Sequence, residues 1–142
     1  MGRVEAVKLL LDTHIWLWSF LAPERLIRRV AEALEEPANE LWLSPVSVWE
    51  ALILAERGRV RLLPTPERWV RDTLHEVPML EPGLNREVAL QSRRLSIPTQ
   101  DPADRFIAAT AHVHELTLVT HDRNLLEIEG VAAISNRHAP DR

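Results

Sequence analysis

The stretch KLLLDTHIWLW, from Lys8 to Trp18, decides the fold expected for this chain. Three consecutive leucines, Leu9 to Leu11, predict a buried strand. A carboxylate, Asp12, follows where the apolar run ends. Burying an unpaired carboxylate is costly, so a residue in this place has either a partner or a chemical role.

Segments with strand-like and helix-like patterns alternate after this point. The expected strands cover residues 7–11, 40–43, 79–80, 116–120 and 131–135. The expected helices cover residues 13–21, with Thr13 as N-cap, and 23–35, 46–57, 67–76, 85–95 and 103–115, with one or two further turns at 123–128. Strands separated by helices predict an α/β fold with a mostly parallel sheet.

Length and composition fit one domain over residues 1–142, with a core of about 7–135 and a loose tail from Asn136. The chain is 46% hydrophobic and 27% charged, and no apolar run approaches the roughly 20 residues of a membrane helix. With no signal-peptide pattern, we expect a cytoplasmic protein without membrane contact. The absence of cysteine excludes disulfides, thiolate zinc sites and cysteine nucleophiles.

Two acids follow predicted strands. Asp12 comes directly after the first strand, and Asp122 follows the strand LTLVT after one intervening residue, His121. In open α/β sheets, sites form beyond the carboxyl ends of the strands. We therefore expect these two carboxylates to face the same crevice.

Three more acids belong to helices. Glu50 falls in the apolar row of SPVSVWEALIL, and Asp104 stands one turn before Ile107 on the face that should pack. Asp101 precedes Pro102, which suits the first position of a helix. Structural roles remain open, because Glu50 could reach water from the edge of the stripe and both aspartates could simply begin a helix. We favour a site role for Asp104 and a capping role for Asp101.

Gathered in one pocket, Asp12, Glu50, Asp104 and Asp122 would repel one another and raise each other's pKa values. A divalent cation relieves that repulsion, and an all-oxygen site favours hard ions such as Mg²⁺ or Mn²⁺. Such ions bind phosphate oxygens and activate water. The acids therefore predict metal-dependent hydrolysis of phosphodiesters.

The motifs LLLDTHIWLW, SVWE, DPADRFIAATA and LVTHD, in this order, resemble the PIN-domain ribonucleases, and most of all the VapC-type toxins of toxin–antitoxin pairs. The resemblance implies a three-layer α/β/α fold around a mostly parallel sheet. It also implies an endoribonuclease that cleaves RNA with metal-activated water, forms a homodimer and is bound by an antitoxin.

The same resemblance implies roles for particular residues. Mg²⁺ or Mn²⁺ is expected at Asp12, Asp104 and Asp122, with Glu50 as a direct or water-mediated ligand and Asp101 as a less certain one. These carboxylates, Asp101 apart, form the expected catalytic set. The expected substrate-binding residues are Thr13 or Thr120, which carry hydroxyls near the pocket, and Arg105, which could equally pair with an acid.

Two other functions remain open from the sequence. A phosphatase or phosphotransferase would use Asp12 as its nucleophile, although His14 stands where haloacid-dehalogenase phosphatases place a second aspartate. A non-catalytic interaction module would keep the fold and lose the activity. The five tryptophans could stack on bases, but packing in the core or an interface is expected for most of them, and for Trp49 above all.

Overall fold

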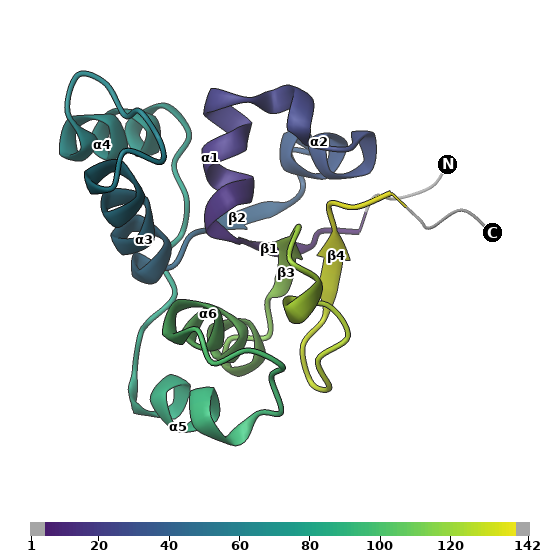
Figure 1. Cartoon of the computed structure of the whole chain (residues 1–142). Helices are drawn as coiled ribbons and strands as arrows, with labels where there is room; N and C mark the ends of the chain where they lie inside the picture. Colours follow the sequence, from purple (N-terminus) through teal and green to yellow (C-terminus); the bar gives the residue numbers. More distant parts are fainter. Residues whose placement is uncertain (1–4, 139–142) are drawn as a thin grey trace, which may run out of the picture.

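A parallel four-stranded sheet forms the centre of the molecule (Figure 1). The computed structural model describes residues 5–138, and residues 1–4 and 139–142 lie outside this range. The strand order is β2-β1-β3-β4, with every neighbouring pair parallel. The strands are β1 (Lys8–Leu11), β2 (Glu40–Trp42), β3 (Thr117–Thr120) and β4 (Ala133–Ser135).

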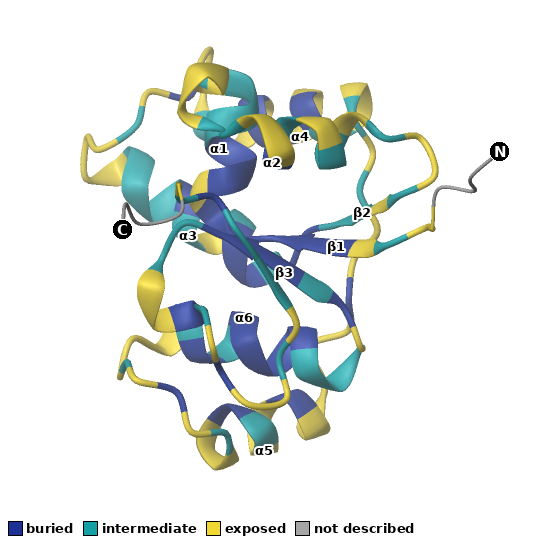
Figure 2. Cartoon of the chain, turned by 90° about the vertical axis from the view of Figure 1, so that its right-hand side faces the viewer, coloured by how far each residue is buried: buried dark blue, intermediate teal, exposed yellow. Residues whose placement is uncertain are grey.

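Helices cover both faces of this sheet, which confirms the predicted three-layer α/β/α architecture (Figure 2). The α-helices are α1 (Thr13–Leu21), α2 (Arg28–Glu35), α3 (Pro45–Glu56), α4 (Pro66–Glu76), α5 (Arg86–Arg94) and α6 (Pro102–Val113). Two 3₁₀ turns, η1 (Pro23–Arg25) and η2 (Arg123–Leu125), complete the described elements. None of the described helices is long and apolar enough to cross a bilayer.

The leucines of β1 divide the interior into two cores. Leu9 and Leu11 pack with side chains of α1, α2, α3 and α4, whereas Leu10 packs with α6 on the opposite face. This separation follows from the period of two in a strand, which turns successive side chains to opposite faces. All three leucines are at most 1% exposed, so β1 is a central strand that is buried on both faces.

Local signals predicted most helix starts, but two of them differ in the structure. Asp12, rather than the predicted Thr13, caps α1, because its carboxylate accepts from the Thr13 backbone N–H. The helix predicted over residues 23–35 is interrupted at Leu26 and Ile27, which are extended. The Ile27 N–H donates to the side chain of Asn136, 109 residues away, so a distant partner satisfies the backbone group at this break.

The tail prediction was wrong at its first residue, because Asn136 is 1% exposed. Its side-chain oxygen accepts from Ile27 N at 2.8 Å, and its side-chain nitrogen donates to Arg25 O at 3.0 Å. Asn136 therefore fastens the end of β4 to the segment between η1 and α2. The rest of the predicted tail, from residue 139, lies outside the described residues.

Trp49 also differs from its prediction, because it is 54% exposed rather than packed. Helix α3 turns Val46, Ser47 and Ala51 toward the interior, and Trp49 lies on the side of the helix away from them. The sequence of α3 did not indicate which of its faces is buried, because the helix is apolar on nearly every side.

Candidate metal centre

The five predicted acids line one open cavity of about 620 Å³ at the carboxyl edge of β1 and β3. They come from the end of β1, the middle of α3, the start of α6 and the turn after β3. Sequence separation between them reaches more than a hundred residues, and only the parallel sheet brings them together. The lining residues are Asp12, His14, Trp18, Glu50, Asp101, Asp104, His121, Asp122, Arg123 and Arg137.

Asp12 is the most buried acid of the pocket, with 8% of its surface exposed. One carboxylate oxygen accepts from Thr13 N at 2.8 Å, and the other accepts from the Thr120 hydroxyl at 2.7 Å. The Asp12 N–H donates to Val119 O, which continues the β1–β3 pairing by one residue. Each oxygen keeps acceptor capacity after these bonds, so Asp12 is fixed in place and still able to bind a cation.

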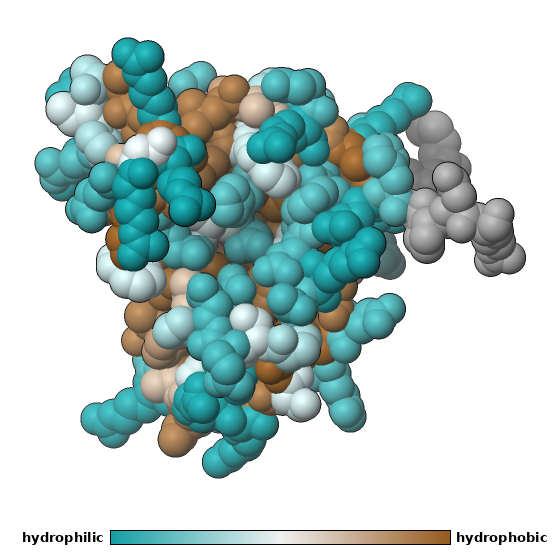
Figure 3. Space-filling model, viewed as in Figure 1, coloured by the Kyte–Doolittle hydropathy of each residue, from teal (hydrophilic) through white to brown (hydrophobic). Residues whose placement is uncertain are grey.

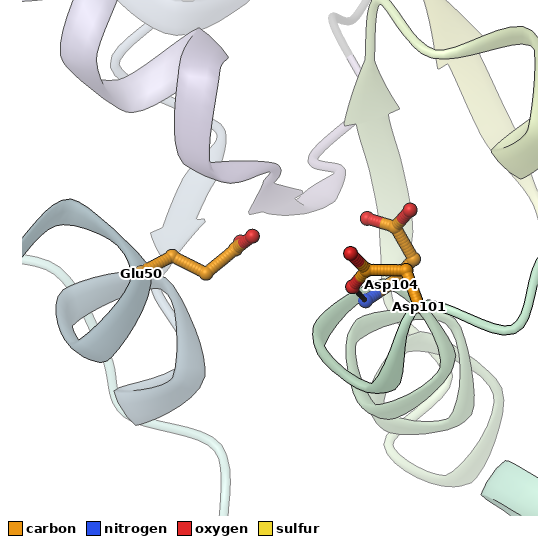
Figure 4. A group of neighbouring side chains, drawn as sticks. All are labelled: Glu50, Asp101 and Asp104. Carbon is orange, nitrogen blue, oxygen red and sulfur yellow. Dashed lines mark hydrogen bonds between the residues drawn. The ribbon is translucent and has the colours of Figure 1, made fainter. Parts of the chain in front are cut away.

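Asp101 and Asp104 lie one turn apart at the start of α6 (Figure 4). Asp101 caps the helix, because its carboxylate accepts from Asp104 N at 3.1 Å. Both side chains reach into the cavity, where Glu50 extends toward them from α3 (Figure 4). One oxygen each from Glu50, Asp101 and Asp104 lies within 4.8 Å of the others, so capping and cation binding are compatible at Asp101.

Two threonine hydroxyls hold the acids rather than facing the cavity. Thr13 is 1% exposed and donates to Glu50, and it also lies 3.1 Å from the Ser47 hydroxyl. Thr120 is fully buried, donates to Asp12 and accepts from Asp122 N at 3.0 Å. Both hydroxyls are engaged inside the protein, so the structure lends no support to contact of Thr13 or Thr120 with substrate, which stays a prediction.

Arg105 also departs from its expected role at the substrate. Its side chain is buried, with 6% of the residue exposed, and its guanidinium donates to the carbonyls of Ser92, Leu95, Ile97 and Thr99. Arg105 thus satisfies the backbone between α5 and α6. The sequence around Arg105 gives no indication of these carbonyl partners, which belong to the end of α5 and the loop that follows it.

Burial and like charge disfavour the ionised form of three of these acids. Burial, together with the charges of the neighbouring carboxylates, raises the pKa of Asp104 to about 7. Burial also raises the pKa of Asp12, against the hydrogen bonds from Thr120 and Thr13. The pKa of Glu50 is raised by burial and by Asp12 and Asp101, although the Thr13 hydroxyl opposes the shift.

The donor set fits a hard divalent cation. Every candidate ligand is a carboxylate oxygen, and oxygen-only sites favour Mg²⁺ or Mn²⁺ over softer ions. A bound cation would also offset the mutual repulsion that raises these pKa values. The acids whose oxygens lie close enough to share one ion are Glu50, Asp101 and Asp104, so they form the candidate cation site, and Asp12 and Asp122 line the same cavity.

The pocket includes five further residues that were not predicted as part of the site: His14, Trp18, His121, Arg123 and Arg137. Arg123 directly follows Asp122, and this adjacency was an available indication. Arg137 reaches the pocket from the end of β4, where it donates to His121 O at 2.9 Å. No feature of the sequence near Arg137 indicated its position.

The chain belongs to the PIN-domain family, whose family model matches residues 9–131. Among characterised relatives, it is 35% identical over 119 residues to Ribonuclease VapC22 from Mycobacterium tuberculosis, a match covering 82% of this chain and 88% of that protein. These findings confirm the resemblance inferred from the motifs.

Solved structures show the same fold at lower identity. VapBC2 from Rickettsia felis, bound to a DNA fragment from its promoter, gives a TM-score of 0.68 at 15% identity, covering 91% of this chain and 98% of that chain. A toxin–antitoxin complex from Klebsiella pneumoniae gives a TM-score of 0.65 at 21% identity, covering 92% and 99%. At these identities the likeness concerns the fold.

The raised pKa of Asp104 predicts a pH-dependent stability for the metal-free protein. The folded-state pKa of about 7 exceeds the ordinary aspartate pKa of 3.8, so the folded state holds an extra proton between these values. Stability from this group is therefore lost as pH rises through this window. In EDTA, urea unfolding should show that wild type loses more stability than Asp104→Asn between about pH 5 and about pH 8.

The matched control is Asp72→Asn on α4, where Asp72 is exposed and pairs with Arg68. This variant should follow the wild-type pH dependence. Equal pH dependence of wild type and Asp104→Asn would contradict the account of Asp104 in a crowded, partly dry pocket.

Proposed function

We propose that this PIN-domain protein is a divalent-metal-dependent endoribonuclease and the toxin of a type II toxin–antitoxin pair. The observation that carries the proposal is the convergence of five carboxylates on one cavity at the carboxyl edge of the sheet. The relative named Ribonuclease VapC22 supports RNA as the substrate. A cytoplasmic location follows from that proposed substrate.

The proposed ligands of Mg²⁺ or Mn²⁺ are Asp12, Asp104 and Asp122, with Glu50 binding directly or through water and Asp101 as a further candidate. When bound, such an ion lowers the pKa of water and neutralises charge on the phosphate. Two hydrogen bonds fix the Asp12 carboxylate at the carboxyl edge of the sheet, beside the other proposed ligands. Glu50 extends from α3 toward Asp101 and Asp104, so its carboxylate is placed to accept a proton from a water bound beside them.

The two other functions left open by the sequence are less well supported. An Asp12 nucleophile is disfavoured because the hydrogen bonds from Thr13 N and the Thr120 hydroxyl reduce the nucleophilicity of its two oxygens, and the residue is only 8% exposed. A non-catalytic module would not need to keep five acids in a partly dry pocket, where they oppose folding. Metal-dependent RNA cleavage separates the ribonuclease from both of these functions.

Assembly with a second copy and with an antitoxin belongs to the same proposal. The solved neighbours include a protein described as a toxin–antitoxin complex. Trp49, 54% exposed, and Leu84, 49% exposed, border a shallow apolar hollow together with Phe106. Apolar side chains are visible at the surface between α3 and α5 (Figure 3). We assign this hollow to the homodimer contact, because exposed apolar surface of this kind favours association.

Asp12→Asn should separate the metal role from a structural role. Asparagine remains a good helix cap and removes one crowded charge, so the metal-free variant should be as stable as wild type, or more stable by about 1 kcal/mol. RNA cleavage should fall by about 100-fold or more, because the ion loses an anchoring ligand. Added Mg²⁺ should raise the melting temperature of the variant less than that of wild type.

Asp72→Asn serves as the control, because it removes an exposed carboxylate outside the cavity. It should leave cleavage and the Mg²⁺-induced shift unchanged. If Asp12→Asn instead melts well below wild type in EDTA and still cuts RNA at the wild-type rate, the nuclease mechanism is wrong.

The homodimer can be tested by light scattering at micromolar concentration. Wild type should have the mass of two chains, and Trp49→Glu should shift the mass toward one chain, because a charge would be buried in the contact. Leu63→Glu, at a position that is 59% exposed outside this hollow, is the matched control. A monomeric wild type, or a Trp49→Glu variant as dimeric as the control, would contradict the assignment.

A further inference from the structure

A second hollow adjoins the acidic cavity and has the opposite charge. The two share His121, Arg123 and Arg137, and the second hollow continues over the end of β4 toward η1 and α2. Its lining includes Arg25, Arg29, Arg123 and Arg137, and Glu127 is the one carboxylate among its described lining residues. We call this the basic groove, defined by these four arginines.

We propose that the basic groove binds the phosphates of single-stranded RNA on one side of the cleavage point, and that Trp18 stacks on a base beside the acidic cavity. This inference rests on the proposed ribonuclease function and adds the path of the substrate strand to it.

The arginines of the groove are available for phosphate. Within residues 5–138, the ion pairs of arginine involve Arg28, Arg68 and Arg71, and none involves a groove arginine. Arg29 donates to Ser135 O at 2.9 Å, and Arg137 donates to His121 O at 2.9 Å. Since a guanidinium carries five N–H donors, these bonds orient the side chains and leave donors for phosphate oxygens.

The groove is also held in shape by the protein. Asn136 joins the end of β4 to Arg25 O and Ile27 N, so the two walls of the groove are fastened to each other. Its backbone N–H donates to Thr120 O at the end of β3, close to the acidic cavity. Figure 3 shows strongly hydrophilic side chains where α2 approaches β4. A groove fixed by buried hydrogen bonds needs little ordering when it binds a strand.

Trp18 lies where the groove meets the acidic cavity. It lines that cavity and is partly exposed. The Arg25 guanidinium lies 4.8 Å from its ring centre, and the His121 ring meets it edge-on at 5.2 Å. Aromatic faces and guanidinium planes are the surfaces on which unpaired bases stack. This cluster therefore offers a place for a base next to the scissile phosphate.

The charge distribution favours RNA over an acidic protein segment as the occupant. The groove leads directly into the carboxylate cavity, and a strand of evenly spaced phosphates can follow the arginines while presenting one phosphate to the acids. An acidic peptide would also bind the arginines, but it has no unpaired base to stack in the cluster around Trp18 and no phosphodiester for the proposed cation.

The test measures binding of a fluorescein-labelled single-stranded RNA by anisotropy, in EDTA so that cleavage does not interfere, over a range of salt concentrations. The double variant Arg123→Gln/Arg137→Gln should weaken binding by about tenfold and reduce the slope of log Kd against log salt by about 1.4, since each single-strand phosphate contact contributes about 0.7. Arg93→Gln/Arg94→Gln on α5 is the control, because it removes two exposed arginines outside the groove.

Trp18→Leu gives an independent readout. Loss of stacking should weaken binding by about tenfold while leaving the salt slope unchanged, because no phosphate contact is removed. Melting temperatures check that each variant is folded. The proposal is overturned if the groove double variant binds RNA with the same affinity and the same salt dependence as the control. It is also overturned if the double variant keeps its affinity for RNA and loses affinity only for an acidic peptide.

Cleavage with Mg²⁺ on the same samples distinguishes the two proposals. If wild type cuts RNA and the groove double variant binds it as wild type does, the strand path is wrong and the ribonuclease function stands. If wild type binds RNA through the groove without metal-dependent cleavage, the ribonuclease function is wrong and the groove stands.

Discussion

The buried carboxylate of Asp12, held by Thr13 N and the Thr120 hydroxyl, is the constraint on which the site depends. These two bonds join the end of β1 to the start of α1 and to the end of β3. They also explain how a charge is tolerated at the edge of the core, because each oxygen has a donor. The other acids approach a position that Asp12 has already fixed.

The same threonines link this anchor to the rest of the pocket. Thr13 follows Asp12 and donates to Glu50 on α3, while Thr120 accepts from the backbone of Asp122. Strand ends and helix starts therefore share one hydrogen-bonded network. The result is a pocket with raised pKa values, which costs stability in the metal-free protein and is relieved when a cation binds. Stability and function are opposed at these residues.

Strands and site residues that show a local sequence pattern could be predicted, whereas side-chain roles that depend on the folded arrangement could not. The leucines before Asp12 indicated the central strand, and an acid in the apolar row of α3 indicated Glu50. The buried role of Asn136 could not be predicted, because its partners are backbone groups more than a hundred residues away. The role of Arg105 could not be predicted either, because its partners are carbonyls exposed only by the way the chain folds between α5 and α6. The positions of the acids at strand ends and on an apolar helix face predicted their grouping, and the resemblance to PIN domains supported it, whereas the basic groove required the three-dimensional arrangement.

The position of a bound cation would show whether Asp12 anchors the site. Anomalous diffraction from crystals soaked in Mn²⁺ should show a peak in the acidic cavity within coordination distance of Asp12 and Asp104, at about 2.0–2.2 Å from their oxygens. Such a peak would place the cation on the carboxylate that β1 and β3 hold in position. A peak bound only by Asp101 and Asp104, or no peak in this cavity, would contradict the claim that the site is built around Asp12.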